Sequence, residues 1–157
     1  LGYDNRDRQY FSILHFSTAA LPDNAVVTKV TLMIRSQSYT GANPFATHRN
    51  IAVDIQKGYF GSSGVLGVNS LDRGDFQAPA SLSNAGTILN NPVTDWYWAT
   101  LDAAANQFIN LTGVTELRLR FQLPDNADRG NDWIRFYSGN YNSSTSHPML
   151  QVEYYVP

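Results

Sequence analysis

The sequence predicts an all-β protein, an antiparallel β-sandwich of the jelly-roll type with seven to eight strands. Short apolar runs alternate with polar residues at a period of two, and clusters of glycine, proline and asparagine separate them. Aromatic residues make up 13% of the chain and charged residues only 15%, a profile that favours sheets over helices. A chain of 157 residues can bury its own core, so we expect a single domain over residues 1–157.

The clearest strand signal lies at residues 115–123, where apolar and polar side chains alternate without exception. Leucine and phenylalanine fall on one face, whereas Arg118 and Arg120 fall on the other. We therefore expect a central strand with one face on the core and the other facing water or a partner. A slip of one residue would bury both arginines, so the register is strongly specified.

The amino-terminal third predicts two strands. Residues 1–7 are polar and turn-like, and residues 8–16 are apolar on both faces, which indicates a central strand covered on both sides. A Leu-Pro-Asp-Asn turn at residues 21–24 leads into residues 25–37, where β-branched side chains predict a strand.

The middle of the chain predicts a loop at residues 38–48 and a half-buried strand at residues 49–57. Residues 58–86 show no sustained period, and we expect an excursion wrapped on the sandwich. The anchors expected for it are Leu66, Leu71 and Phe76.

The carboxy-terminal part predicts an aromatic strand at residues 95–101 and a single helical turn at residues 103–108, where alanines are frequent. After the central strand at residues 115–123, apolar and polar residues alternate again at residues 132–137 and 149–156, and polar loops separate these segments.

Composition excludes several partners. The net charge is -2 and no basic stripe occurs, so we expect no nucleic acid partner. No apolar run approaches the length of a membrane span, so we expect no membrane insertion. The chain contains no cysteine, which removes disulfides and thiolate metal sites.

The sequence predicts a protein without enzymatic activity. Glycoside hydrolysis needs two carboxyl groups that flank one bond, but the two glutamates, Glu116 and Glu153, lie within alternating strands. His15, His48 and His147 are far apart and show no metal-binding spacing.

Aromatic residues are the candidates for sugar binding, because planar rings stack on the apolar faces of pyranose rings. Trp96 and Trp98 share one face of their predicted strand while Tyr97 lies on the other, and one of these faces must be core. The candidates for a carbohydrate platform are Trp98, Trp133, Tyr137 and Tyr141. The alternative for each ring is core packing.

Arginines supply a second candidate feature. Arg118 and Arg120, joined by Arg35 if the strands pair, could form a basic groove for an anionic polysaccharide. The ordinary alternative is cross-strand pairing with carboxylates. The carboxylates considered for this are Glu116, Glu153 and Asp54.

The acidic loop at residues 125–132 resembles a calcium site, because hard cations prefer clustered carboxylate and amide oxygens. The expected ligands of a structural Ca²⁺ are Asp125, Asn126, Asp128 and Asp132. The loop lacks the spacing of an EF-hand and its terminal glutamate, so the alternative is a hairpin turn whose Asp and Asn side chains cap their own backbone.

Strand motifs at both ends suggest a family. RQYFSILHF at residues 8–16, the Leu-Pro turn, the strand that ends in VTLMI, the middle stretch NPFATHRNIAVDIQKGYF and the closing HPMLQVEYYVP together resemble the DNRLRE-domain family. Its members are extracellular bacterial and archaeal β-sandwich modules. The resemblance implies an extracellular or cell-surface location and no catalysis, and some relatives are carbohydrate-binding modules for acidic or plant-type polysaccharides.

One departure from that family leaves two readings of function. Family members usually carry a further strand upstream of the arginine-containing one, so this chain is either the carboxy-terminal module of a larger protein or lacks an amino-terminal edge strand. We expect a carbohydrate-binding or adhesive module of a secreted or cell-surface protein. The alternative is a structural subunit of an extracellular filament or surface assembly, completed by the β-strand of a partner or neighbouring domain.

Overall fold

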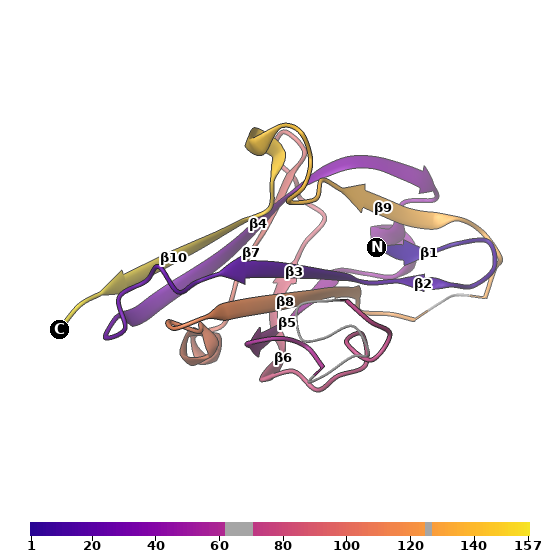
Figure 1. Ribbon diagram of the computed structural model, residues 1–157. Helices are drawn as coiled ribbons and strands as arrows, with labels where there is room; N and C mark the ends of the chain where they lie inside the picture. Colours follow the sequence, from indigo (N-terminus) through magenta and orange to yellow (C-terminus); the bar gives the residue numbers. More distant parts are fainter. Residues whose placement is uncertain (62–70, 125–126) are drawn as a thin grey trace.

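Two antiparallel sheets face each other in the computed structural model, which describes residues 1–61, 71–124 and 127–157 (Figure 1). One sheet has the strand order β10-β4-β9-β1-β2, with β7 also paired to β4, and the other has the order β3-β8-β5-β6. The strands are β1 (Gly2–Tyr3), β2 (Gln9–Tyr10), β3 (Ser12–Ser17), β4 (Val26–Gly41), β5 (Ile51–Lys57), β6 (Leu82–Ile88), β7 (Trp96–Thr100), β8 (Val114–Phe121), β9 (Asp132–Phe136) and β10 (Met149–Tyr155).

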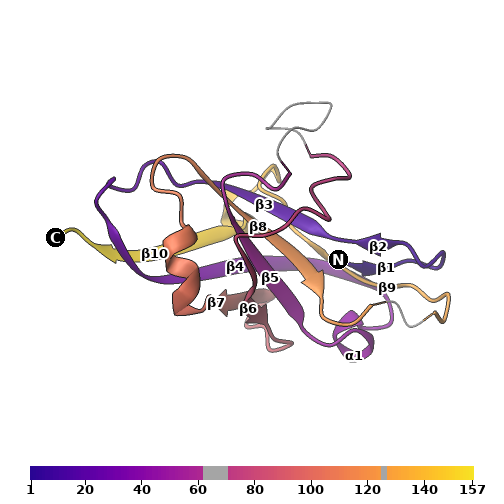
Figure 2. The same cartoon turned by 90° about the horizontal axis from the view of Figure 1, so that it is seen from below.

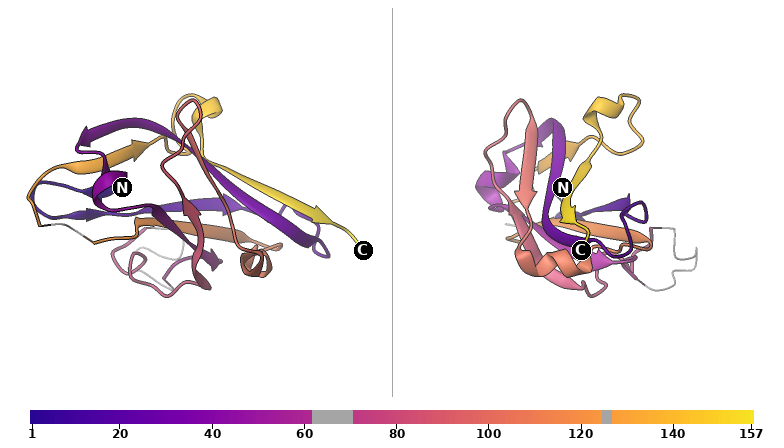
Figure 3. Two further views of the ribbon diagram at one scale, coloured as in Figure 1. Left: turned by 180° about the vertical axis from the view of Figure 1, so that it is seen from behind. Right: turned by 90° about the vertical axis from the view of Figure 1, so that its left-hand side faces the viewer.

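The predicted all-β sandwich is confirmed. Eight strands among the described residues are five residues or longer, which agrees with the predicted number, and β1 and β2 have two residues each. The chain passes from one sheet to the other at most connections, as in a jelly roll (Figure 3). Within the described residues, no helix is both long enough and apolar enough to cross a membrane.

Strand β4 organises the six-stranded sheet. Its 16 residues pair with β10 near the start, with β7 in the middle and with β9 at the end. Val30, Leu32 and Ile34 alternate inward and are almost completely buried. A bulge between Ser36 and Ser38 shifts the register before β9 begins to pair. This bulge lets β4 continue through residues 38–41, which we expected to form a loop.

Strand β8 organises the four-stranded sheet, with β3 on one side and β5 on the other. Its apolar residues Leu117, Leu119 and Phe121 are buried in the core, as the alternation predicted. Full burial of one such side chain contributes about 1.5–3 kcal/mol to stability. These three residues therefore contribute much of the free energy that holds the four-stranded sheet on the core.

The polar face of β8 differs from the prediction. Glu116 and Arg118 are buried, because the covering segment, residues 58–61 and 71–81, lies over them. Leu71 is exposed, whereas the ring of Phe76 lies 6.1 Å from that of Phe11. Leu66, the third expected anchor, lies outside the described residues.

The prediction that residues 8–16 form a central strand is wrong. β3 is an edge strand that pairs only with β8. The apolar residues on its two faces have separate partners. Leu14 and Phe16 pack on the core. On the other face, His15 contacts Tyr59 of the covering segment, and Phe11, just before β3, contacts Phe76.

Short helices complete the fold. The predicted turn is confirmed as the 3-10 helix η1 (Ala103–Phe108), which contacts β4, β5 and β6 (Figure 2). The sequence did not predict α1 (Pro44–Thr47), whose first turn is capped by the Asn43 side chain bonding to the Phe45 N–H. A second 3-10 helix, η2 (Ser144–Ser146), precedes β10. Strand β6 also begins inside the stretch expected to be irregular, residues 58–86, and extends beyond it to Ile88.

Candidate functional site

The outer face of the six-stranded sheet gathers aromatic, arginine and methionine side chains. Residues paired across strands share a face of the sheet, so the register assigns them. Their neighbours Leu32, Ile34 and Tyr97 point into the core, which leaves the intervening residues outward. We call this surface the aromatic face; it comprises Met33, Arg35, Trp96, Trp98, Trp133, Arg135, Tyr137, Tyr141 and Met149.

A row of side chains crosses three strands of the aromatic face. Met33 of β4 lies opposite Met149 of β10 on one side and opposite Trp98 of β7 on the other. Trp98 is 39% exposed and Met149 43% exposed. The indole therefore presents its ring to solvent beside two adaptable thioether side chains.

The opposite side of β7 fixes that indole. Tyr97 points inward, stacks on Phe45 with a centroid distance of 5.4 Å, and shares a hydrogen bond with the Tyr39 hydroxyl. Burial, followed by this hydrogen bond, raises the pKa of Tyr97, so its hydroxyl stays neutral. A rigidly held Tyr97 forces the alternate residues Trp96 and Trp98 outward.

Arg35 joins the row to the carboxy-terminal loop. It is paired with Trp96 across the strands, and its guanidinium carbon lies 5.9 Å from the centroid of the Tyr137 ring. The guanidinium also donates to the Ser146 hydroxyl at 3.1 Å. The ring of Tyr141 lies 4.5 Å from that of Tyr137, so two tyrosines and one arginine form a cluster.

Strand β9 adds the remaining pair. Trp133, Arg135 and Tyr137 alternate along the chain and so share one face. The Arg135 guanidinium lies 5.1 Å from the centroid of the Trp133 ring. All four aromatic residues expected to form a platform, Trp98, Trp133, Tyr137 and Tyr141, therefore lie on the same side of one sheet.

Sequence reasoning missed Arg135, Met33 and Met149. Alternation along β9 could have placed Arg135 beside Trp133. The methionines could not have been found, because their place depends on which strands are neighbours, and the sequence does not reveal strand order.

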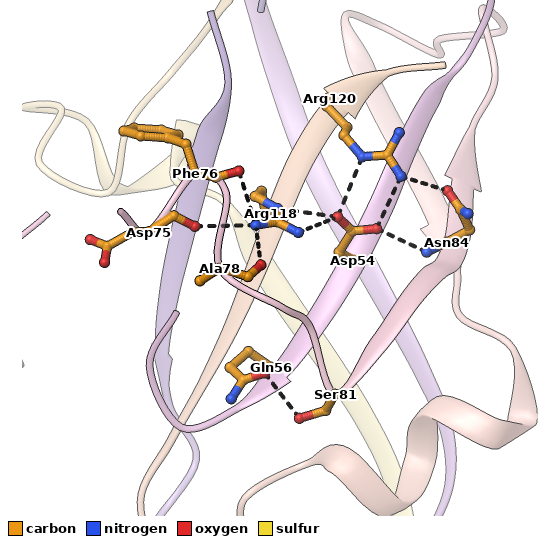
Figure 4. A network of polar contacts seen from close by, with 9 residues as sticks. All are labelled: Asp54, Gln56, Asp75, Phe76, Ala78, Ser81, Asn84, Arg118 and Arg120. Atoms are coloured by element: carbon orange, nitrogen blue, oxygen red, sulfur yellow. Dashed lines mark hydrogen bonds and ion pairs between the residues drawn. The ribbon is translucent and has the colours of Figure 1, made fainter. Parts of the chain in front are cut away.

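Arg118 and Arg120 do not belong to the aromatic face, and the expectation that they meet Arg35 in a basic groove is corrected. They lie on β8, in the other sheet (Figure 4). Both pair with the buried carboxylate of Asp54, with Arg118 Nη2 2.9 Å and Arg120 Nε 3.4 Å from Asp54 Oδ2. Cross-strand pairing with Asp54 was the ordinary alternative, and it is confirmed.

Arg118 holds the covering segment on the sheet. Its Nη1 donates to the carbonyls of Asp75, Phe76 and Ala78 at 2.7–3.1 Å (Figure 4). Its guanidinium also stacks on Phe60. The Nε, Nη1 and Nη2 atoms of Arg118 thus all donate to oxygen atoms of the protein. Its role in the structure is to fix a loop.

The expected calcium ligands do not converge in the described residues. Asp125 and Asn126 lie outside them. Asp128 accepts a hydrogen bond from the Gly130 N–H at 2.6 Å, as in the turn alternative. Asp132 is buried and turned toward His48, not toward the loop. In the part of the chain that is described, no group of three acidic, histidine or cysteine side chains could hold a metal. Calcium binding stays a prediction.

The buried pair of His48 and Asp132 was not anticipated. His48 Nε2 lies 2.7 Å from Asp132 Oδ2, and Nδ1 lies 3.1 Å from the Pro124 carbonyl. The His48 ring contacts Tyr3 at a centroid distance of 4.7 Å. This pair ties the α1 region to β9 and β1.

The two glutamates do not face each other. Glu116, on the four-stranded sheet, accepts a hydrogen bond from the Phe60 N–H at 2.7 Å and lies 3.3 Å from the His15 ring nitrogen. Glu153, on β10 of the other sheet, pairs with Lys29 at 2.9 Å. Each carboxylate thus has a structural partner.

Comparisons of the chain with protein-family models, with curated proteins and with solved structures found no match. The geometry of the aromatic face is therefore the basis for a proposal of function.

Proposed function

We propose that this chain is a non-catalytic carbohydrate-binding module that binds a polysaccharide through the aromatic face. The observation that carries the proposal is the placement of Trp96, Trp98 and Trp133 on one face of a single sheet. Indole rings held on the strands of a sheet can stack on successive pyranose rings without first ordering a loop.

The charges of the aromatic face suggest the class of glycan. Arg35 and Arg135 lie beside aromatic rings, and guanidinium groups bind carboxylates through two parallel hydrogen bonds. The two arginines favour a polysaccharide that contains uronic acids. A module of this kind would act in a secreted or cell-surface protein, which agrees with the family resemblance of its strand motifs.

Affinity electrophoresis in gels that contain alginate, pectin or xylan tests the proposal. We expect retardation in the uronate-containing gels, alginate and pectin. Trp98→Ala should weaken the retardation at least tenfold, which corresponds to about 1.4 kcal/mol of binding free energy.

Tyr155→Ala is the matched control, because Tyr155 is an exposed aromatic residue (55% exposed) at the far end of β10. It should leave retardation unchanged. Equal migration of the unaltered protein in all gels and in plain acrylamide would remove the support for the proposal.

A further inference from the structure

Arg135 on the aromatic face differs from three basic residues elsewhere in the sheets, each of which lies directly opposite a carboxylate on a neighbouring strand. Those three pairs are Lys29 with Glu153, His15 with Glu116, and Arg118 with Asp54. Arg135 is exposed and lies opposite Ser38. No described residue forms a hydrogen bond or an ion pair with its guanidinium. Its charge is therefore available to an anionic ligand.

Trp133 holds the Arg135 side chain in place. The guanidinium lies over the indole, 5.1 Å from the ring centroid. This contact attracts the cation to the ring and leaves the N–H groups in the guanidinium plane free to donate. An arginine held in this way loses less conformational freedom when it binds a ligand than one that moves freely in water.

Arg35, the other arginine of the aromatic face, is already engaged with the protein. Its Nη1 donates to the hydroxyl of the buried residue Ser146 at 3.1 Å, and its Nε is buried. These contacts tie the loop before β10 to strand β4. Arg135 is thus the arginine of the two whose planar pair of donors is free to bind both oxygens of a carboxylate.

The strand register separates Arg135 from the most exposed indole, that of Trp98. Trp98 lies opposite Met33 and Arg135 lies opposite Ser38, so five residues of β4 lie between the two levels. At about 3.3 Å per residue this separation is on the order of 15 Å. A single sugar ring cannot span it, but an oligosaccharide can contact both groups.

We propose that Arg135 is the specificity-determining residue of the aromatic face and binds the carboxylate of a uronic acid residue. Another sugar of the same glycan chain stacks on Trp98, and Trp133 is a positioning residue that holds the guanidinium. The inference rests on the proposed carbohydrate binding and adds to it that the ligand is an oligosaccharide with free carboxylate groups.

Affinity electrophoresis in demethylated pectin and in highly methyl-esterified pectin tests this assignment, because esterification removes the negative charge and leaves the sugar rings. The unaltered protein should be retarded at least fivefold more strongly by demethylated pectin. Arg135→Gln should reduce this preference to less than twofold. Arg73→Gln is the matched control: Arg73 is exposed on the covering segment of the other sheet, and its loss should leave the preference unchanged.

Variants of Trp133 test its positioning role. Trp133→Phe keeps a ring beneath the guanidinium and should retain the preference for demethylated pectin. Trp133→Leu should lose it as completely as Arg135→Gln does, and combining the two substitutions should weaken binding no further, because both remove the same contact. A double variant that binds esterified pectin more weakly than Arg135→Gln alone would overturn the positioning role.

The two levels of the proposal fail in different ways. No retardation of the unaltered protein in either gel would contradict carbohydrate binding itself. Retardation of the unaltered protein that Arg135→Gln leaves unchanged, or lowers equally in both gels, would overturn the assignment of Arg135 alone.

Discussion

At the residue scale, the Asp54 carboxylate is the shared partner of two arginines. It is completely buried, pairs with Arg118 and Arg120, and accepts a hydrogen bond from the Asn84 N–H at 2.9 Å (Figure 4). These contacts join β5 to β8 and to β6. Removal of the carboxylate would leave the Arg118 guanidinium buried without its counter-charge.

We predict that Asp54→Ala lowers the free energy of unfolding by about 3–5 kcal/mol, the usual cost of breaking a buried ion pair from one side. Urea denaturation followed by circular dichroism measures it. Lys29→Ala, which breaks the exposed pair with Glu153, is the control and should cost about 0–1 kcal/mol. Equal losses in both variants would show that the Asp54 network contributes little.

Asp4 makes the amino-terminal hairpin sensitive to acid. Its carboxylate accepts hydrogen bonds from the Arg8 side chain, from the backbone N–H groups of Arg6 and Arg8, and from the Tyr10 hydroxyl. The Arg8 side chain is the largest cause that holds the pKa of Asp4 well below its ordinary value. The stabilisation is present above the ordinary carboxyl pKa of about 3.9 and is lost as the pH falls below it.

The predicted consequence is that Asp4→Asn removes part of the fall in stability between about pH 6 and about pH 2, because over that range the Asp4 carboxylate of the unfolded chain takes up a proton whereas the folded one, with its lowered pKa, stays ionised. Denaturation midpoints at both pH values measure the effect. Asp102→Asn is the control, since the Asp102 side chain is exposed and makes no capping hydrogen bond. An unchanged pH dependence in Asp4→Asn would contradict the assignment.

At the element scale, the junction of β4 and β9 depends on a glycine. Gly41 has a φ of +76°, and a Cβ atom placed there would lie 1.5 Å from the Asn131 carbonyl oxygen. Gly58 also has a positive φ, +104°, but no atom lies within 4 Å of its Cβ position. An alanine at Gly58 would therefore experience backbone strain alone, whereas an alanine at Gly41 would experience backbone strain and a steric clash.

Gly58→Ala should cost about 1–2 kcal/mol through its backbone conformation alone, and Gly41→Ala should cost more because β9 must also move away from β4. Thermal and urea denaturation of both variants provide the comparison. If Gly41→Ala were as stable as Gly58→Ala, the close packing of the two strands at this point would be wrong.

The elements show what the sequence could predict. Regular alternation located β8 and its inward residues Leu117 and Leu119, because one face of that strand packs on the core. Alternation could not show that the polar face with Arg118 is covered, since the covering segment has no period of its own. The apolar faces of β3 indicated two contacts but not an edge position, because strand order depends on pairing between distant segments.

For the candidate site, too, residue types could be predicted from the sequence, whereas contacts that depend on strand pairing could not. Trp98, Trp133, Tyr137 and Tyr141 could be selected by residue type, and pairing through β4 places them on one sheet. Arg118 could not be assigned by type, because an arginine on a strand suits a ligand and a buried aspartate equally well. The identity of its partner, Asp54, depends on the register of β5 and β8.

At the scale of the whole molecule, the two outer sheet faces differ. The covering segment lies over Glu116 and Arg118 on the four-stranded sheet, whereas the aromatic face of the six-stranded sheet exposes Trp98 and Tyr141. The six-stranded sheet is therefore the face on which we propose that a polysaccharide binds.

The most direct measurement uses the three tryptophans of the chain, all of which lie on the aromatic face. Their indole N–H signals can be followed in a proton–nitrogen correlation spectrum during titration with uronate oligosaccharides from alginate or pectin. The account predicts that the Trp98 and Trp133 indole signals shift, while backbone amides of β5 and β6 stay in place. Shifts confined to the four-stranded sheet, with unmoved indole signals, would contradict it.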